Sequence, residues 1–201
     1  MYARVNDTRL SPDRIDDLVE FLTNKVQPVV MAQPGCRGLA VSSNRSTGRS
    51  GIVSYWDDRQ TLEASEAAIT SLREETVAAV DATISQITIA EVVRARRDRP
   101  SQLGMATRSV LLGGAASRID ELLVTYDSEN LPRLAAQPGF CGALLLLSRD
   151  TDQAASLTIW EDEKALTASE STSAALRDEV TTRGVTIDDV QTGEIVLLEL
   201  L

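Results

Sequence analysis

Histidine is absent from this 201-residue sequence. Without an imidazole the chain cannot build a Ser-His-Asp or Cys-His nucleophile system, and it offers no histidine ligand to haem or zinc. Any general base must therefore be a carboxylate, a lysine, a tyrosine, a cysteine or water. This absence excludes most of the familiar hydrolase and metalloenzyme classes.

Cysteine is scarce as well, with Cys36 and Cys141 as its two occurrences. Two cysteines do not make a disulfide framework, and a structural zinc site needs about four ligands. We therefore expect two buried free thiols in a protein of the reducing cytoplasm, and no metal site.

Long apolar runs and an excess of positive charge are also missing. The longest apolar run, residues 143–147, is far short of the roughly 20 residues of a membrane span, and the N-terminus has no apolar segment of signal-peptide length. The formal net charge of −10 argues against nucleic acid as a partner. With 43% hydrophobic and 25% charged residues, the composition is that of a soluble globular protein.

One segment is strongly basic, R-A-R-R-D-R at residues 94–99. It is followed by Pro100, Ser101 and Gly104, which favour irregular structure. We interpret residues 94–104 as a solvated linker, with phosphate binding as the alternative.

The sequence repeats itself at an offset of 104 residues. R-I-D-D-L at 14–18 aligns with R-I-D-E-L at 118–122, and A-Q-P-G at 32–35 aligns with A-Q-P-G at 136–139. Near the end of each copy the alignment needs a one-residue shift. We interpret this as an internal duplication. The expected domains are 1–93 and 105–201, joined by the linker 94–104.

Each copy alternates between two periodicities. Strand-like stretches with polar hairpin loops flank segments whose apolar residues recur at three- and four-residue spacing, which is typical of helices. The order is β-α-β-β-α-β, the ferredoxin-like split fold. The expected strands are 3–6, 39–43, 52–56 and 87–93 in the first copy, and 107–112, 143–147, 155–160 and 194–200 in the second. Because such a sheet carries helices on one face only, we expect the sheets of the two copies to cover each other.

The two tryptophans of the chain align with each other. Trp56 and Trp160 each end an expected strand in the pattern [ST]-x-W, and an acidic, Ala/Leu-rich helix follows. Earlier in each copy, P-G-x-x-G opens a strand. This pattern resembles the antibiotic biosynthesis monooxygenase (ABM) domain family, and the resemblance covers both copies. It implies two ferredoxin-like units packed as a dimeric α+β barrel, here a pseudo-dimer within one chain that leaves a further homodimer open.

The resemblance also implies an activity. Relatives similar to this chain oxidise quinols or polyketide-derived phenols with O₂ and no bound cofactor, or cleave haem. The expected site is an apolar pocket between sheet and helices, where a small aromatic substrate loses a proton and reacts with oxygen away from water.

The site residues of the family carry over unevenly. Asn6 matches the first-strand asparagine of the haem-cleaving branch, but the second copy has Val110 there. The second-helix tryptophan of that branch falls at Ser65 and Ser169, and its axial histidine falls near Glu75. This argues against haem cleavage. Because many other relatives have histidine at the serine position, a degenerate activity is an alternative.

Five residues are candidates for the pocket: Asn6, Trp56, Ser65, Trp160 and Ser169. Each also has a structural explanation. The tryptophans can pack in the core, the serines can bond helix backbone, and Asn6 can cap a strand end. Because the first copy has the polar Asn6 and the second copy has more apolar strands, we hypothesise that the first copy holds the functional pocket.

Two functions from different classes fit the sequence. One is a cofactor-independent monooxygenase acting on a quinol-like or polyketide-like aromatic. The other is a non-catalytic barrel that binds a small apolar ligand or serves as an interaction protein. Oxygen uptake with hydroquinones and anthrones would distinguish them.

Overall fold

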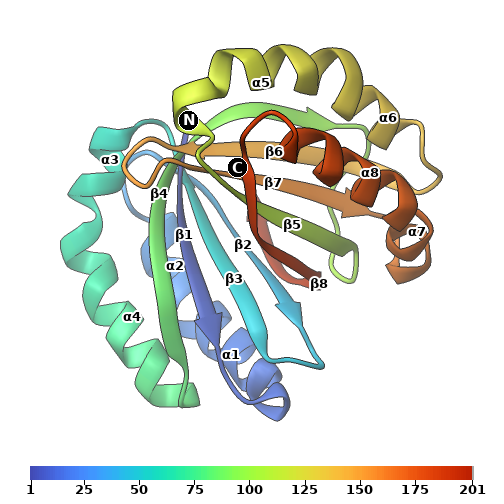
Figure 1. The fold of residues 1–201 in the computed structure, drawn as a ribbon. Helices are drawn as coiled ribbons and strands as arrows, with labels where there is room; N and C mark the ends of the chain where they lie inside the picture. The colour runs from blue at the N-terminus through green and yellow to red at the C-terminus, as the bar shows by residue number, and fades with distance from the viewer. Residues whose placement is uncertain (201) are drawn as a thin grey trace. The chain divides into compact units, whose positions relative to one another are not determined.

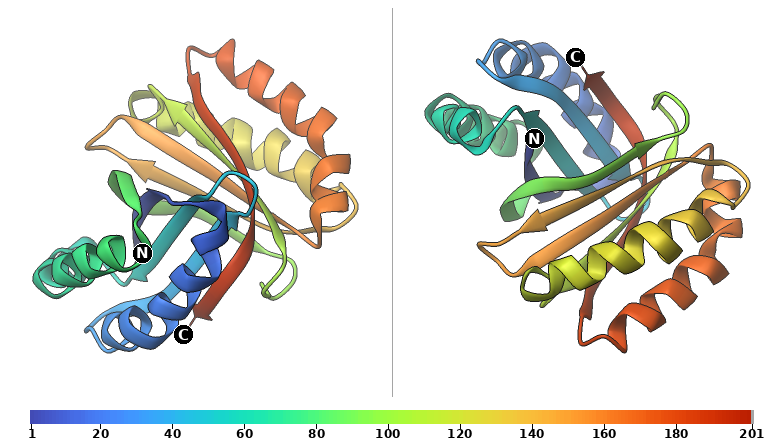
Figure 2. Two further views of the ribbon diagram at one scale, coloured as in Figure 1. Left: turned by 90° about the horizontal axis from the view of Figure 1, so that it is seen from below. Right: turned by 90° about the horizontal axis from the view of Figure 1, so that it is seen from above.

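The computed structural model describes residues 1–200. Contacts divide them into two compact units, which we call unit 1 and unit 2. Unit 1 comprises residues 1–91 and the described residues from Gly193 onward, and unit 2 comprises Val92–Thr192. In each unit the helices lie on one face of the strands (Figure 1, Figure 2). No helix among residues 1–200 is long and apolar enough to cross a membrane.

Unit 1 is an antiparallel sheet covered by helices on one face. Its strands are β1 (Tyr2–Arg9), β2 (Cys36–Asn44), β3 (Arg49–Trp56), the first part of β4 (Thr83–Arg97) and the last part of β8 (Thr186–Leu200). They pair in the order β4-β1-β3-β2-β8. The helices are α1 (Ile15–Phe21), α2 (Gln27–Met31), α3 (Arg59–Ala64) and α4 (Glu66–Val80).

Unit 2 repeats this arrangement. Its strands β5 (Ala106–Gly113), β7 (Gln153–Trp160) and β6 (Phe140–Ser148) pair antiparallel in that order. Its helices are α5 (Ile119–Thr125), α6 (Leu131–Ala135), α7 (Glu163–Ala168) and α8 (Glu170–Thr181). The tandem ferredoxin-like organisation predicted from the repeat is confirmed.

The order of hydrogen-bonded strands closes on itself. It reads β1-β3-β2-β8-β5-β7-β6-β4, and β4 returns to β1. The two long strands β4 and β8 make this closure because each has one part in unit 1 and the other part in unit 2. This closed antiparallel order confirms the predicted α+β barrel class.

Strand β4 is longer than the sequence predicts. It runs to Arg97, so the first four residues of the expected linker 94–104 are strand. Two of the three arginines in this extension have acidic partners, Arg94 with Asp127 at 2.8 Å and Arg96 with Asp98 at 2.7 Å. The interpretation of these four residues as a solvated linker is wrong.

The first helical segment of each unit contains a wide π turn that the periodicity does not reveal. It spans Leu22–Val26 in unit 1 and Tyr126–Asn130 in unit 2. A proline follows in each case, Pro28 and Pro132. Proline lacks an N–H and crowds the carbonyl four residues earlier, and a local widening of the helix accommodates both effects. One predicted helix is therefore two, α1 and α2 or α5 and α6, joined by this turn.

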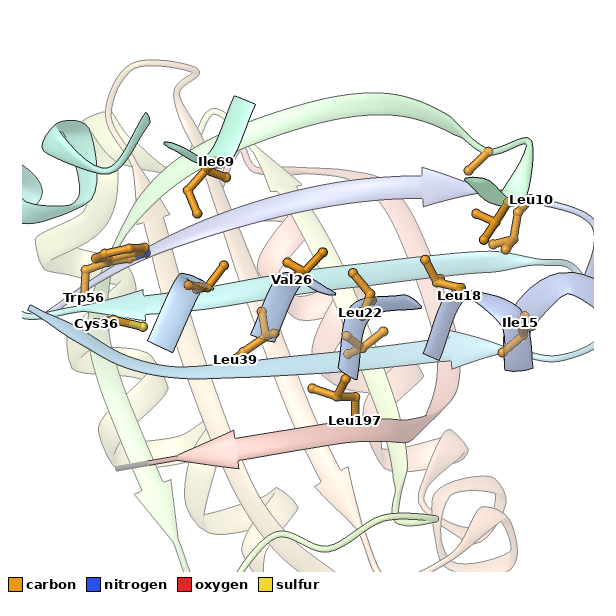
Figure 3. Close-up of a cluster of buried hydrophobic side chains, with 14 of the residues drawn as sticks. Leu10, Ile15, Leu18, Leu22, Val26, Cys36, Leu39, Trp56, Ile69 and Leu197 are labelled. Atoms are coloured by element: carbon orange, nitrogen blue, oxygen red, sulfur yellow. The ribbon is translucent and has the colours of Figure 1, made fainter. Parts of the chain in front are cut away.

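The core of unit 1 lies between its sheet and its helices. Figure 3 shows Ile15, Leu18, Leu22 and Val26 of the first helical segment directed at β2 and β3, with Trp56 at the end of β3. The two cysteines are buried and free, as predicted. Burial raises the pKa of both thiols, which keeps them protonated and apolar in character.

Candidate functional site

The repeated tryptophans are core residues at strand ends. Trp56 and Trp160 are both 0% exposed. Each indole N–H donates a hydrogen bond of 2.9 Å to a hydroxyl two residues earlier on the same strand, Ser54 in unit 1 and Thr158 in unit 2. Neither indole lines the two pockets described below. Each tryptophan therefore packs beneath helices and holds one strand hydroxyl.

An arginine is buried beneath each repeated motif. Arg4 on β1 is 1% exposed and Arg108 on β5 is 2% exposed. Both terminal nitrogens of Arg4 lie 3.2 Å from the hydroxyl of Ser65, and one donates to a carbonyl of α3 at 2.7 Å. Arg108 donates to the hydroxyl of Ser169 at 2.9 Å and to a carbonyl of α7 at 2.8 Å. The two candidate serines thus bond a buried guanidinium.

The glutamate that follows each serine forms an ion pair with the buried arginine. Glu66 pairs with Arg4 at 2.8 Å, and Glu170 pairs with Arg108 at 2.7 Å. Burial lowers the pKa of each arginine, and its glutamate opposes the shift. Because an arginine pKa begins far above neutrality, both guanidinium groups stay charged. The repeated A-S-E sequence therefore fixes the junction of two helices onto the first strand of its unit.

Sequence reasoning missed these two arginines. A signal was available, because Arg4 and Arg108 align at the 104-residue offset in the first strand of each copy. A charge at the same place in both copies of a strand indicates a buried partner rather than solvent.

Unit 1 has a pocket between its helices and its sheet. About 540 Å³ of space there is not filled by protein atoms, and part of it is open to solvent. Its apolar lining is Leu22, Val26, Val30, Leu39, Ile52, Ile69, Leu72, Val77, Ala82 and Ile84, and its polar lining is Asn6, Thr8, Ser54, Arg73 and Thr76. An apolar cavity with a few polar groups is the usual form of a small-molecule site.

Of the five residues predicted for the pocket, Asn6 lines it directly. Trp56 reaches its wall through the hydrogen bond to Ser54. Ser65 does not line the pocket, and its hydroxyl accepts a hydrogen bond from the buried guanidinium of Arg4. Trp160 and Ser169 belong to unit 2 and hold the equivalent places there.

Asn6 and Arg73 form a polar pair at the edge of the pocket. Arg73 Nε donates to Asn6 Oδ1 at 3.2 Å, and Asn6 Nδ2 donates to the carbonyl of Ile52 at 3.3 Å. Asn6 lies within β1 rather than at its end, so its interpretation as a strand-end cap is wrong. Both side chains are mostly buried, Asn6 at 9% and Arg73 at 15% exposure.

Glu66 connects this pair to the buried arginine. Its carboxylate accepts from both terminal nitrogens of Arg73 at 3.1 Å while it pairs with Arg4. Burial raises the pKa of Glu66, but the two guanidinium groups outweigh burial and hold that pKa below its ordinary value. A continuous network of ion pairs and hydrogen bonds therefore links Arg4, through Glu66 and Arg73, to Asn6 in the pocket lining.

Unit 2 has a pocket of different chemistry. About 470 Å³ of space there is not filled by protein atoms, and part of that space is open to solvent. Its lining is Leu112, Ile119, Leu122, Thr125, Tyr126, Asn130, Leu145, Ala154, Glu179, Val180 and Arg183. Val110 replaces Asn6, and Arg177 bonds Glu170 without lining the cavity. Within residues 1–200 no group of three or more His, Cys, Asp or Glu side chains is placed to hold a metal ion.

Residues 1–76 match the family model for antibiotic biosynthesis monooxygenase. The matched range contains every side chain of the Arg4–Glu66–Arg73–Asn6 chain. The ABM resemblance noted in the sequence is thereby confirmed.

Similar proteins match most of this chain, in sequence or in fold. The uncharacterised protein Rv2557 of Mycobacterium tuberculosis is 25% identical over 177 residues, which covers 88% of this chain and 79% of that protein. A solved structure of an anthrone oxidase-like protein has a TM-score of 0.70 at 17% identity and covers 99% of this chain and 93% of its own. A monooxygenase-like protein from Listeria innocua has a TM-score of 0.59 at 12% identity, covering 97% and 94%. These two structures share the fold of this chain over nearly its whole length.

Proposed function

We propose that unit 1 binds a small, electron-rich aromatic molecule, quinol-like or polyketide-like, and oxidises it with O₂ without a bound cofactor. The observation that supports this most strongly is the Asn6–Arg73 pair at the edge of an otherwise apolar pocket. The proposal also draws on the ABM match, which spans this pocket's first strand and its arginine.

The pocket offers such a molecule two kinds of contact. Its aliphatic walls suit a flat ring and exclude water around it. The Arg73 guanidinium favours the ionised form of a nearby substrate hydroxyl and lowers its pKa, because an opposite charge stabilises the anion. Ser54 accepts the Trp56 indole hydrogen, so its own hydroxyl proton can be donated to the ligand.

Ionisation prepares the substrate for oxygen. An aromatic enolate or phenolate is more electron-rich than its neutral acid and can transfer electrons to O₂ directly. For an anthrone-like substrate, a ring CH₂ becomes C=O. One atom of O₂ joins that carbon, and the other leaves as water with the two hydrogens.

A second candidate is binding without turnover, and one observation favours it. The described lining of the unit 1 pocket contains no carboxylate, lysine, tyrosine or cysteine that could act as a base. In the catalytic proposal the substrate proton must therefore pass to water or to Glu66, whose carboxylate bonds Arg73. A non-catalytic carrier needs no such acceptor.

Oxygen uptake separates the two candidates. Wild-type protein is supplied with anthrone and with 1,4-dihydroxynaphthalene, and uptake above the spontaneous rate is measured. The variant Asn6→Val places the unit 2 residue in unit 1, and Val110→Asn is its matched control. Uptake that is lost in Asn6→Val and kept in Val110→Asn supports the oxidation. Saturable binding without uptake supports the carrier, and the absence of both binding and uptake overturns both candidates.

The tryptophans test the choice of unit. Trp56→Phe and Trp160→Phe are compared for ligand affinity. We expect Trp56→Phe to weaken binding more, because Trp56 holds Ser54 in the pocket wall. Equal effects would contradict a functional pocket confined to unit 1.

A further inference from the structure

The pockets of the two units differ at the first residue of the π turn. Leu22 begins the π turn of unit 1, and Tyr126 begins the π turn of unit 2. Both side chains line the pocket of their own unit, and both are buried, at 1% and 6% exposure. Because the turn is the same in both units, the difference lies in the side chain.

The tyrosine reaches across its unit toward the sheet. Its hydroxyl interacts with Ser156 of β7, the residue that aligns with Ile52. Ile52 lines the open pocket of unit 1. The hydroxyl has almost no exposed surface and makes no hydrogen bond of full geometry, so the aromatic side chain ends in the interior rather than in solvent. Tyr126 therefore extends into the place that is open beside Leu22.

The two pocket linings differ around this position. They share four aligned positions, which are Thr8 with Leu112, Leu22 with Tyr126, Val26 with Asn130, and Thr76 with Val180. The residues that align with Asn6, Ser54 and Arg73 of the polar lining of unit 1 are missing from the lining of unit 2, and these are Val110, Thr158 and Arg177. The unit 2 cavity extends instead toward Leu145 and Ala154, near the β6–β7 hairpin.

We infer that Tyr126 at this position, together with Val110 in place of Asn6, keeps the ligand out of unit 2. Leu22 leaves the space beside Asn6 and Arg73 open, whereas Tyr126 fills the equivalent space in unit 2. The duplicated chain then takes up one aromatic ligand rather than two. This inference rests on the proposed function, because the ligand is the aromatic molecule of unit 1.

Isothermal titration calorimetry with 2-naphthol, a phenol that lacks the reactive CH₂ group, tests the inference. Wild type is expected to bind one equivalent. Leu22→Tyr is expected to bind at least tenfold more weakly, while the control Val124→Tyr, at an exposed position outside both pockets, keeps its affinity. The double variant Tyr126→Leu/Val110→Asn is expected to bind a second equivalent, because it restores both the space and the asparagine.

The outcomes separate the two claims. A wild type that binds no 2-naphthol overturns the proposed function and this inference with it. A wild type that binds one equivalent while Leu22→Tyr keeps full affinity overturns the inference alone, as does a wild type that binds two. If Leu22→Tyr does not fold, the double variant decides: a second site supports the inference, and a stoichiometry that stays at one overturns it.

Discussion

Arg73 Nε lies 3.2 Å from Asn6 Oδ1, and this contact ties helix α4 to strand β1 at the mouth of the unit 1 pocket. Unit 2 has Arg177 and Val110 at the aligned positions, and valine accepts no hydrogen bond. The duplicated units therefore share a scaffold and differ where a ligand would meet it.

Removing this contact should weaken ligand binding. Asn6→Val is expected to raise the dissociation constant for 2-naphthol by about tenfold to a hundredfold, because a hydrogen bond to a charged group contributes about 1.5–3 kcal/mol. Calorimetry measures the change, and Val110→Asn serves as the control that leaves affinity unchanged. Wild-type affinity in Asn6→Val would show that the pair does not position the ligand.

Removing the carboxylate of Glu66 should destabilise the protein more than removing the charge of Arg4. Glu66→Gln leaves the Arg4 charge buried without its ion pair, and we expect a loss of about 1–3 kcal/mol, less than for a fully buried pair because Glu66 is 47% exposed. Arg4→Met is expected to cost less, since it removes the charge and keeps the volume. Urea denaturation measures both variants. A greater loss in Arg4→Met would contradict this order.

The free energy of unfolding should decrease in acid because the Glu66 carboxylate becomes protonated. The pKa of Glu66 lies below its ordinary value in the folded protein, against the burial that raises it, because of Arg73 and Arg4. The carboxylate therefore contributes stability that is complete above the unfolded value of about 4.3 and is lost as the pH falls through the folded value. Urea midpoints between pH 6 and pH 3 should show a component that Glu66→Gln lacks. Parallel curves for wild type and Glu66→Gln would show that Glu66 does not contribute to the pH dependence of stability.

The Tyr126 hydroxyl should ionise at a higher pH than an exposed tyrosine. Burial raises its pKa to about 12, with a smaller opposing effect of Ser156. Ultraviolet titration should show a phenolate transition near that pH that is missing from Tyr126→Phe. A tyrosine pKa is about 10 in the unfolded chain, so the contribution to stability is complete below pH 10 and is lost as the pH rises toward 12. A Tyr126 transition near pH 10 would show that the hydroxyl is not buried in solution.

Much of the fold follows from the sequence because the chain carries its pattern twice. Each copy supports the other, so short strand signals that are ambiguous alone become reliable together. The extension of β4 to Arg97 was missed because four charged or small residues look like a loop when their backbone partners are unknown. The π turns were missed because apolar spacing alone does not register one extra residue in a helical turn.

The site was only partly predictable. Asn6 could be singled out because it matches the first-strand asparagine of the resembled family, and it lines the pocket of unit 1. Arg4 does not stand out, because its role depends on helix α4 returning across β1 to bring Glu66 within 2.8 Å. The contrast between Leu22 and Tyr126 reads as two ordinary apolar positions until the neighbouring strand is known.

The long strands β4 and β8 have a consequence for how the protein is made. The β2 edge of unit 1 is completed by β8, where Gly38 stands opposite Leu200, and all of unit 2 lies between them in the sequence. Unit 1 therefore cannot finish its sheet during synthesis until the whole of unit 2 has followed it. An isolated first repeat would expose a bare strand edge, which invites association with other chains. The first repeat therefore depends on the last strand of the second repeat to complete its sheet.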